Sequence, residues 1–260
     1  MAQTSRKHAL IIVDLQKDFL PGGALAVPGG DKIVPVIREV LEKNSWDCIV
    51  MTQDWHPAGH VSFARNHEGR HVLDVIELPY GMQMLWPVHC VEGTDGAAIE
   101  GVDTMKADLV LRKGRELNID SYSAFCAADN ETKTGLAGCL RERGITDVWV
   151  CGLALDYCVS FTAIDAAREG FDTHVITDAS AAIDASSGEG RSRLATCLHR
   201  RVHCRGRARA RVLTQIHHAS LAAPVPTRTA FFFGDGRCRV LPREYASTGE
   251  RRAEKGRQRG

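Results

Sequence analysis

A cysteine, an aspartate and a lysine stand where they could act together as a nucleophilic centre. Cys158 follows the apolar segment DVWVCGL, at the start of a predicted helix. A thiol at a helix N-terminus lies near the positive end of the helix dipole, which lowers its pKa and favours the thiolate. Asp14 could take the thiol proton and return it to a leaving amine, while Lys113 could keep Asp14 ionised and orient the sulfur. This set predicts cysteine-based hydrolysis of an amide.

Each of these residues also has an ordinary structural explanation. A cysteine is most often a buried packing residue. An aspartate that ends a strand often caps backbone N–H groups, and a single lysine usually lies on the surface. What favours catalysis is the shared position of the three residues relative to the predicted strands.

A group of acidic and imidazole side chains indicates a metal site. Asp54 and His56 are separated by one residue in DWH, so both can project from one extended segment, and His89 in WPVHC could supply a third ligand. One aspartate and two histidines, with further positions open to water, suit Zn, Mn or Fe, and the sequence does not choose among these divalent ions. His60 and His71 are further candidates.

The elements that must position these residues alternate between strand and helix patterns. Unbroken apolar runs predict strands, and spaced apolar residues predict helices. Residues 55–103 are rich in Gly, Pro, His and Trp, which indicates a long functional insertion. The alternation predicts an α/β fold, a three-layer doubly wound, mostly parallel sheet with helices on both faces. The predicted strands are 8–15, 47–54, 108–114, 147–153 and 172–179, and the predicted helices 31–44, 132–143 and 158–170.

In such a sheet, ligands bind at the carboxyl ends of the strands. Asp14, Asp54 and Lys113 each end a predicted strand, and Cys158 comes just after the fourth. The fold pattern therefore predicts that these four side chains meet on one rim.

The overall composition is that of an ordinary globular protein. The chain has 260 residues, of which 44% are hydrophobic and 25% charged. Because no apolar run reaches about 18 residues and the N-terminus lacks a secretory pattern, we expect neither membrane association nor export. The nine cysteines are scattered without CxxC pairs, which predicts reduced thiols and a cytoplasmic location.

Charge divides the chain into two parts. Residues 1–184 carry 16 Lys+Arg against 27 Asp+Glu, a balance of −11, whereas residues 185–260 carry 17 against 5, a balance of +12. The second part is rich in Arg and shows no periodicity, so we predict a disordered tail or a shifted reading frame. A real extension that binds nucleic acid or another polyanion is the alternative. Because the tail lacks interleaved aromatic residues, nucleic acid is not the partner that we expect.

Several stretches together resemble the nicotinamidases of the isochorismatase-like cysteine hydrolase superfamily. The resemblance covers residues 8 to about 183 and implies that residues 1–184 form one isochorismatase-like hydrolase domain. That family normally adds a helix and a strand soon after the position of Ala182, so the basic tail is atypical and the sheet edge is expected to be exposed. The stretches are ALIIVDLQKDFLPGGALAVPGG, TQDWHPAGHVSFA, WPVHCVEGTDGA, LRKGRELNIDSYSAF, GLALDYCVSFTAIDAAREGF and VITDA.

The resemblance implies hydrolysis of nicotinamide to nicotinate and ammonia through a thioester on Cys158, a step in NAD salvage. It further implies an oxyanion hole formed by the N–H groups of Ala154 and Cys158, and a cis peptide in the turn at Ala154–Leu155. The metal would bind the pyridine nitrogen. Ring-pocket positions of the family match Phe19, Trp86 and Tyr122.

Two other functions fit parts of the same sequence. Related amidohydrolases act on carbamoyl or ureido amides and lack the metal cluster. A non-catalytic relative with a polyanion-binding tail is the other alternative. The sequence leaves a homo-oligomer open.

Overall fold

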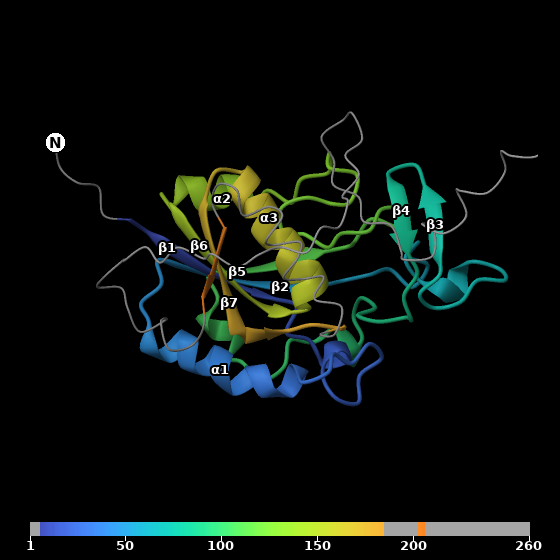
Figure 1. The fold of residues 1–260 in the computed structure, drawn as a ribbon, viewed down its shortest axis with the longest axis horizontal. Helices are drawn as coiled ribbons and strands as arrows, with labels where there is room; N and C mark the ends of the chain where they lie inside the picture. The colour runs from blue at the N-terminus through green and yellow to red at the C-terminus, as the bar shows by residue number, and fades with distance from the viewer. Residues whose placement is uncertain (1–5, 185–201, 206–260) are drawn as a thin grey trace, which may run out of the picture. The chain divides into compact units, whose positions relative to one another are not determined.

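A parallel sheet forms the centre of the computed structural model, which describes residues 6–184 and 202–205 (Figure 1). In the described chain this sheet has six strands in the order β5-β2-β1-β6-β7-β8, and all five ladders are parallel. The predicted α/β class is therefore confirmed. The strands are β1 His8–Val13, β2 Cys48–Asp54, β5 Leu109–Lys113, β6 Asp147–Leu153, β7 Asp172–Ala181 and β8 Val202–Arg205.

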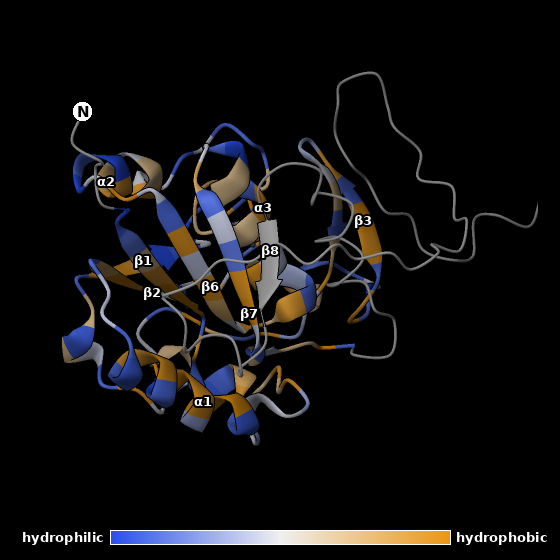
Figure 2. Cartoon of the chain, turned by 60° about the vertical axis from the view of Figure 1, so that its left-hand side comes forward, coloured by the Kyte–Doolittle hydropathy of each residue, from blue (hydrophilic) through white to orange (hydrophobic). Residues whose placement is uncertain are grey.

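Helices cover both faces of the sheet. Helix α1 (Gly30–Lys43) lies on one face, and α2 (Leu136–Glu142) and α3 (Ser160–Arg168) lie on the other (Figure 1). Along β1, Leu10 and Ile12 pack in the core under α1, whereas Ile11 and Val13 pack in the core under α2 and α3. Because both faces are covered, the central strand β1 is apolar and buried from Ala9 to Val13. In Figure 2, orange residues alternate with blue and pale ones along β6 and β7. No helix in the described ranges is long and apolar enough to cross a membrane.

The long insertion between β2 and β5 contains a hairpin that the sequence did not predict. Strands β3 (Val75–Leu78) and β4 (Gly81–Met84) pair antiparallel and form a separate two-stranded sheet. Both strands have four residues and mixed burial, so they lack the alternation by which a longer half-buried strand is recognised. The remaining regular structure of this region is limited to single turns at Ala64–Asn66, Asp95–Ala97 and Thr104–Lys106; a further such turn, Lys17–Phe19, follows β1.

Strand β8 lies within the basic tail, where the sequence predicted no strand. It pairs with β7 from Thr173 to Ile176, so the expectation of an exposed β7 edge is wrong along these residues. Edge pairing uses backbone N–H and C=O groups, and it therefore needs no apolar pattern in the added strand. The predictions of disorder, a shifted reading frame or polyanion binding in the rest of 185–260 lie outside the described residues.

The order of the strands creates a crevice at one end of the sheet. From β1 the chain builds β2 and β5 on one side and then crosses to β6 and β7 on the other. The switch between β1 and β6 is where an open α/β sheet binds its ligand. Asp14 leaves β1 there, and a single π-helical turn, Leu155–Val159, follows β6 there.

Close contact between β1 and β6 at this switch requires a glycine. Gly152 has φ +117°, and a Cβ at this position would collide with the Val13 carbonyl oxygen. We expect Gly152→Ala to lower the free energy of unfolding by at least about 2 kcal/mol in urea titrations, because both the backbone and the contact oppose the change. The matched control is Gly138→Ala at an exposed position of α2, where a Cβ meets nothing within 4 Å. It should be neutral or stabilising by up to about 1 kcal/mol. Equal urea midpoints for the two variants would contradict this account.

Candidate active site

The strand ends bring the four predicted chemical residues to one point. Asp54 and Lys113 are opposite one another in the β2–β5 ladder, and Asp14 follows β1 with a left-handed backbone of φ 47°. Cys158 comes from the π-helical turn after β6, on the other side of β1. All four side chains are buried.

The Lys113 ammonium joins these side chains. Its Nζ lies 2.8 Å from Asp14 Oδ2 and 2.5 Å from Asp54 Oδ1. It also lies 3.4 Å from Cys158 Sγ and donates to the Ser121 carbonyl oxygen at 3.0 Å. Burial alone would lower the pKa of Lys113, but the carboxylates of Asp14 and Asp54 outweigh it and hold the pKa well above its usual value. The cation therefore stays charged inside the protein.

Asp14 combines a fixed position with a raised proton affinity. Burial raises the pKa of its carboxyl to about 6, although the Lys113 charge opposes the shift. Thr52 on β2 holds the group: its hydroxyl donates to Asp14 Oδ1 at 2.5 Å and accepts the Asp14 backbone N–H at 3.0 Å. Sequence reasoning missed Thr52, whose signal is a hydroxyl inside an apolar strand. Asp14 is thus mostly ionised at neutral pH yet accepts a proton readily.

The pKa of the Cys158 thiol differs from the sequence prediction. Cys158 precedes α3 and belongs to the π-helical turn, where it is buried. Burial raises the pKa of the Cys158 thiol well above its usual value, and the Lys113 charge opposes this only in part. The predicted lowering by a helix dipole is therefore wrong for this site, because desolvation of the sulfur dominates. The thiol needs a base, and Asp14 is the buried base beside it: one of its carboxylate oxygens and Sγ lie within 4.8 Å.

The turn that carries Cys158 begins directly after β6. The cis peptide lies at Leu153–Ala154, one residue before the predicted position at Ala154–Leu155. The Ala154 carbonyl accepts the N–H groups of Tyr157 and Val159 at 3.0 and 3.1 Å, which fixes the turn around Cys158.

Asp54, His56 and His89 bring three ligand atoms together at the edge of the same pocket. Asp54 Oδ2 lies 3.6 Å from His56 Nε2 and 3.9 Å from His89 Nε2, and all three side chains are buried. The Nδ1 atoms of the two imidazoles each lie 2.8 Å from a backbone carbonyl oxygen, that of Gly114 for His56 and that of Pro87 for His89. Donation to these carbonyls leaves both Nε2 atoms as lone-pair donors. A nitrogen–nitrogen–oxygen set of this kind fits a divalent ion.

The three ligand residues differ in the direction of their pKa shifts. The Asp54 pKa is lowered, since Lys113 and His56 outweigh the effect of burial. Burial lowers the pKa of His89 to about 4, helped by the neighbouring His56. Asp54 raises the pKa of His56 above its usual value, although burial opposes this shift. Because metals bind an ionised carboxylate and neutral imidazoles, a metal ion would have to displace any proton on His56.

The two further histidine candidates do not join these three ligands. His60 Nδ1 lies 2.7 Å from Ser62 Oγ, and its Nε2 lies 3.3 Å from the Ile119 carbonyl oxygen. It groups instead with His56 and Asp120. The His71 side chain is 87% exposed and only approaches Asp74.

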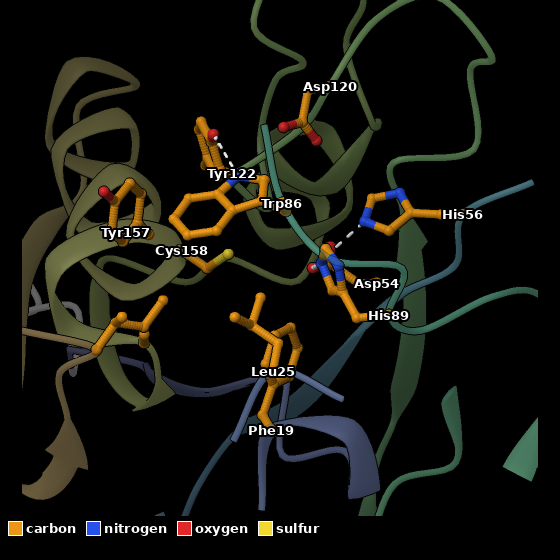
Figure 3. A pocket seen from close by; sticks show the side chains of 12 residues that line it. Phe19, Leu25, Asp54, His56, Trp86, His89, Asp120, Tyr122, Tyr157 and Cys158 are labelled. Carbon is orange, nitrogen blue, oxygen red and sulfur yellow. Dashed lines mark hydrogen bonds and ion pairs between the residues drawn. The ribbon is translucent and has the colours of Figure 1, made fainter. Parts of the chain in front are cut away.

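Aromatic side chains form the walls of the pocket between Cys158 and the histidines (Figure 3). Trp86 and Tyr122 lie on one side with Tyr157, and Phe19 lies opposite with Leu25 (Figure 3). Trp86 Nε1 donates to the Tyr122 hydroxyl at 3.0 Å, and the Trp86 and Tyr157 rings meet edge to face at 4.9 Å. This shape suits a flat ring whose substituent reaches Cys158.

Sequence reasoning missed part of the pocket lining. Leu25, Asp120, Tyr157 and Ile183 also line it. Leu25, Asp120 and Ile183 come from loops and Tyr157 from the single π-helical turn, and neither has a periodic pattern that marks a side chain as facing a cavity. Tyr157 alone had a local signal, since it precedes the candidate nucleophile.

Comparisons with known proteins place this arrangement in a family. The isochorismatase domain family matches residues 8–192. The nicotinamidase of Acinetobacter baylyi is 54% identical over 177 residues, which cover 68% of this chain and 82% of that protein. The chain belongs to the nicotinamidases of the isochorismatase-like family.

Solved structures of this family have the same fold. A nicotinamidase/pyrazinamidase from Acinetobacter baumanii superposes with a TM-score of 0.73 at 45% identity, covering 78% of this chain and 97% of that one. An L. infantum structure in complex with nicotinate has a TM-score of 0.68 at 38% identity, covering 80% and 96%. The pyrazinamidase of Pyrococcus horikoshii in complex with zinc has a TM-score of 0.62 at 35% identity, covering 77% and 99%.

Removing the Lys113 charge tests how far the buried site depends on it. Lys113→Met leaves Asp14 and Asp54 buried without their cation, so we expect the free energy of unfolding to fall by about 3–5 kcal/mol in urea at neutral pH. Lys43→Met is the matched control, because Lys43 forms an exposed pair with Glu39 at 2.9 Å. That change should cost less than about 0.5 kcal/mol. A similar small loss in both variants would show that the ion pairs contribute little.

Proposed function

We propose that this protein hydrolyses nicotinamide to nicotinate and ammonia, with Cys158 as the nucleophile. The observation that carries the proposal is the Lys113 ammonium, which contacts Asp14, Asp54 and the Cys158 sulfur beside an aromatic pocket. Membership of the nicotinamidases supports the substrate, as does the nicotinate-bound relative from L. infantum. The reaction is consistent with a place in NAD salvage.

The first half of the reaction is acylation of the thiol. Asp14 accepts the Cys158 proton as the sulfur attacks the amide carbon, and a C–S bond forms while the carbonyl electrons move to oxygen. The N–H groups of Ala154 and Cys158 are the proposed donors to this oxyanion. When the carbonyl re-forms, the C–N bond breaks, and Asp14 gives its proton to the amine, which leaves as ammonia.

The second half releases the acid. A water molecule attacks the thioester carbon and gives a proton to Asp14. The C–S bond then breaks, and Asp14 returns its proton to the sulfur. The product leaves as nicotinate after its carboxyl group has lost the second water proton to solvent. The Asp14 pKa of about 6 suits these transfers, because a group that titrates near the working pH can both accept and donate.

Lys113 acts throughout as a fixed positive charge. It stabilises the ionised form of Asp14 and attracts the sulfur as it becomes a thiolate. Its contact with Asp54 Oδ1 also fixes the carboxylate whose other oxygen faces the histidines.

Asp54, His56 and His89 would hold one divalent ion, for which Zn, Mn and Fe are the candidates. When bound, such an ion supplies a Lewis-acidic site for the pyridine nitrogen of the substrate. The zinc-bound pyrazinamidase of P. horikoshii supports a metal here. Phe19, Trp86 and Tyr122 would hold the ring between that site and Cys158. A cytoplasmic location and a homo-oligomer remain predictions.

The alternative of a carbamoyl or ureido amide is less well supported. The resemblance implies a metal cluster for nicotinamidases and none for the carbamoyl or ureido enzymes, and three buried ligand atoms converge here. The alternative of a non-catalytic relative does not explain why nucleophile, base and cation are all present and in contact.

The direct test is release of ammonia and nicotinate from nicotinamide by the purified full-length chain. Cys158→Ala removes the atom that forms the thioester, so kcat should fall by at least about a thousandfold. Cys139→Ala in α2 is the matched control and should keep wild-type kcat, since Cys139 lies outside the pocket. Undiminished turnover in Cys158→Ala would exclude the cysteine mechanism.

A second test addresses the metal site without using activity. A Cβ at Gly114 (φ +65°) would collide with the His56 imidazole, so Gly114→Ala should displace this ligand. We expect metal affinity, measured by titration calorimetry and elemental analysis, to fall by about 10–100-fold. Gly69→Ala is the control, because Gly69 has φ +70° with nothing within 4 Å. It carries the same backbone cost and should bind metal as the wild type does. Equal metal contents in all three proteins would argue against these ligands.

A further inference from the structure

Asp156 is a buried carboxylate that the proposed reaction does not use. It lies in the π-helical turn between Ala154 and Cys158 and is 2% exposed. Its two oxygens reach forward in the sequence: Oδ1 accepts the backbone N–H of Ile183 at 3.0 Å, and Oδ2 accepts that of Asp184 at 2.9 Å. Charge-assisted hydrogen bonds of this kind are stronger and more directional than neutral ones.

These bonds hold a segment that the sheet no longer holds. The last β6–β7 ladder pair is Leu153 with Ala181, so Ile183 lies two residues beyond the ladder. Its side chain nevertheless lines the pocket together with Ala154 and Cys158. It also packs against the core cluster that contains Leu153 and Phe19. The Asp156 carboxylate therefore supplies two hydrogen bonds that help to fix the position of this part of the pocket wall.

We propose that Asp156 is a positioning residue and Ile183 a specificity-determining residue, which together limit the pocket to small, flat heteroaromatic carboxamides. This rests on the proposed function. Asp156 touches no reacting atom in this scheme. It links the turn that carries the nucleophile to the pocket wall that faces the substrate ring. The distance between the nucleophile and that wall is thereby kept constant.

The test compares nicotinamide with a set of ring-methylated nicotinamides, using the full-length enzyme. Ile183→Ala should raise kcat/KM for at least one methylated amide about tenfold relative to nicotinamide, because a pocket discriminates by roughly this factor for one methyl group. Asp156→Asn keeps the size of the side chain but has a single acceptor oxygen. It should shift the same ratio in the same direction, mainly by raising KM for nicotinamide. The double variant should shift the ratio no further than Ile183→Ala alone, since both changes act on one wall.

Asp165→Asn on α3 is the matched control, because Asp165 pairs with Arg168 at 3.0 Å outside the pocket. It should leave the ratio unchanged. Should Asp156→Asn fail to fold in a thermal melt, Asp156→Glu keeps both oxygens, moves them by one methylene and should shift the ratio as well.

Two results would overturn the inference. One is an unchanged ratio in Ile183→Ala. The other is an Asp156 variant that lowers kcat/KM for every amide by the same factor, as a merely structural role would. If the wild type releases no ammonia from nicotinamide, the proposed function fails instead. The same ratio is then measured as calorimetric Kd values for nicotinate and methylated nicotinates, with the same two outcomes.

Discussion

The buried ammonium of Lys113 is the interaction on which the rest of the site depends. Asp14, Asp54 and the Cys158 sulfur are all withdrawn from water, and two unpaired carboxylates in such a place would be very costly. The single Lys113 ammonium contacts all three of these side chains. It can do so because β5, β2 and β1 are neighbours, with Asp54 opposite Lys113 in the ladder, and because β6 brings Cys158 from the far side of β1. The strand order is therefore a requirement of the chemistry.

Asp54 extends this dependence to the metal ligands. Its Oδ1 forms an ion pair with the Lys113 ammonium, while its Oδ2 faces His56 and His89. The lowered pKa of Asp54 has both neighbours among its causes. Lys113 and Asp54 thus connect the nucleophile to the metal ligands. A change of charge at Cys158 or at the histidines alters the electrostatic potential at the other group. This explains why the two sets of residues stand on the same rim.

The sequence predicted the site residues that lie at the ends of strands, and it missed the pocket residues and hydrogen bonds that loops and turns provide. Apolar runs that end in Asp14, Asp54 and Lys113 predict a shared rim, because parallel strands present their carboxyl ends on one side. The Cys158 pKa was predicted in the wrong direction, since a helix dipole can be read locally but burial of the sulfur cannot. Hydrogen bonds of Asp156 span 27 and 28 residues, and no local pattern announces them. Strand β8 was missed because its pairing is made by the backbone.

The two ends of β7 are held by different contacts. The β7–β8 ladder runs from Thr173 to Ile176, at the end of β7 away from the pocket. Ile183 lies at the other end, beyond the last pair with β6, and there the Asp156 carboxylate holds it. The turn that carries the nucleophile therefore contributes directly to holding this wall of the pocket.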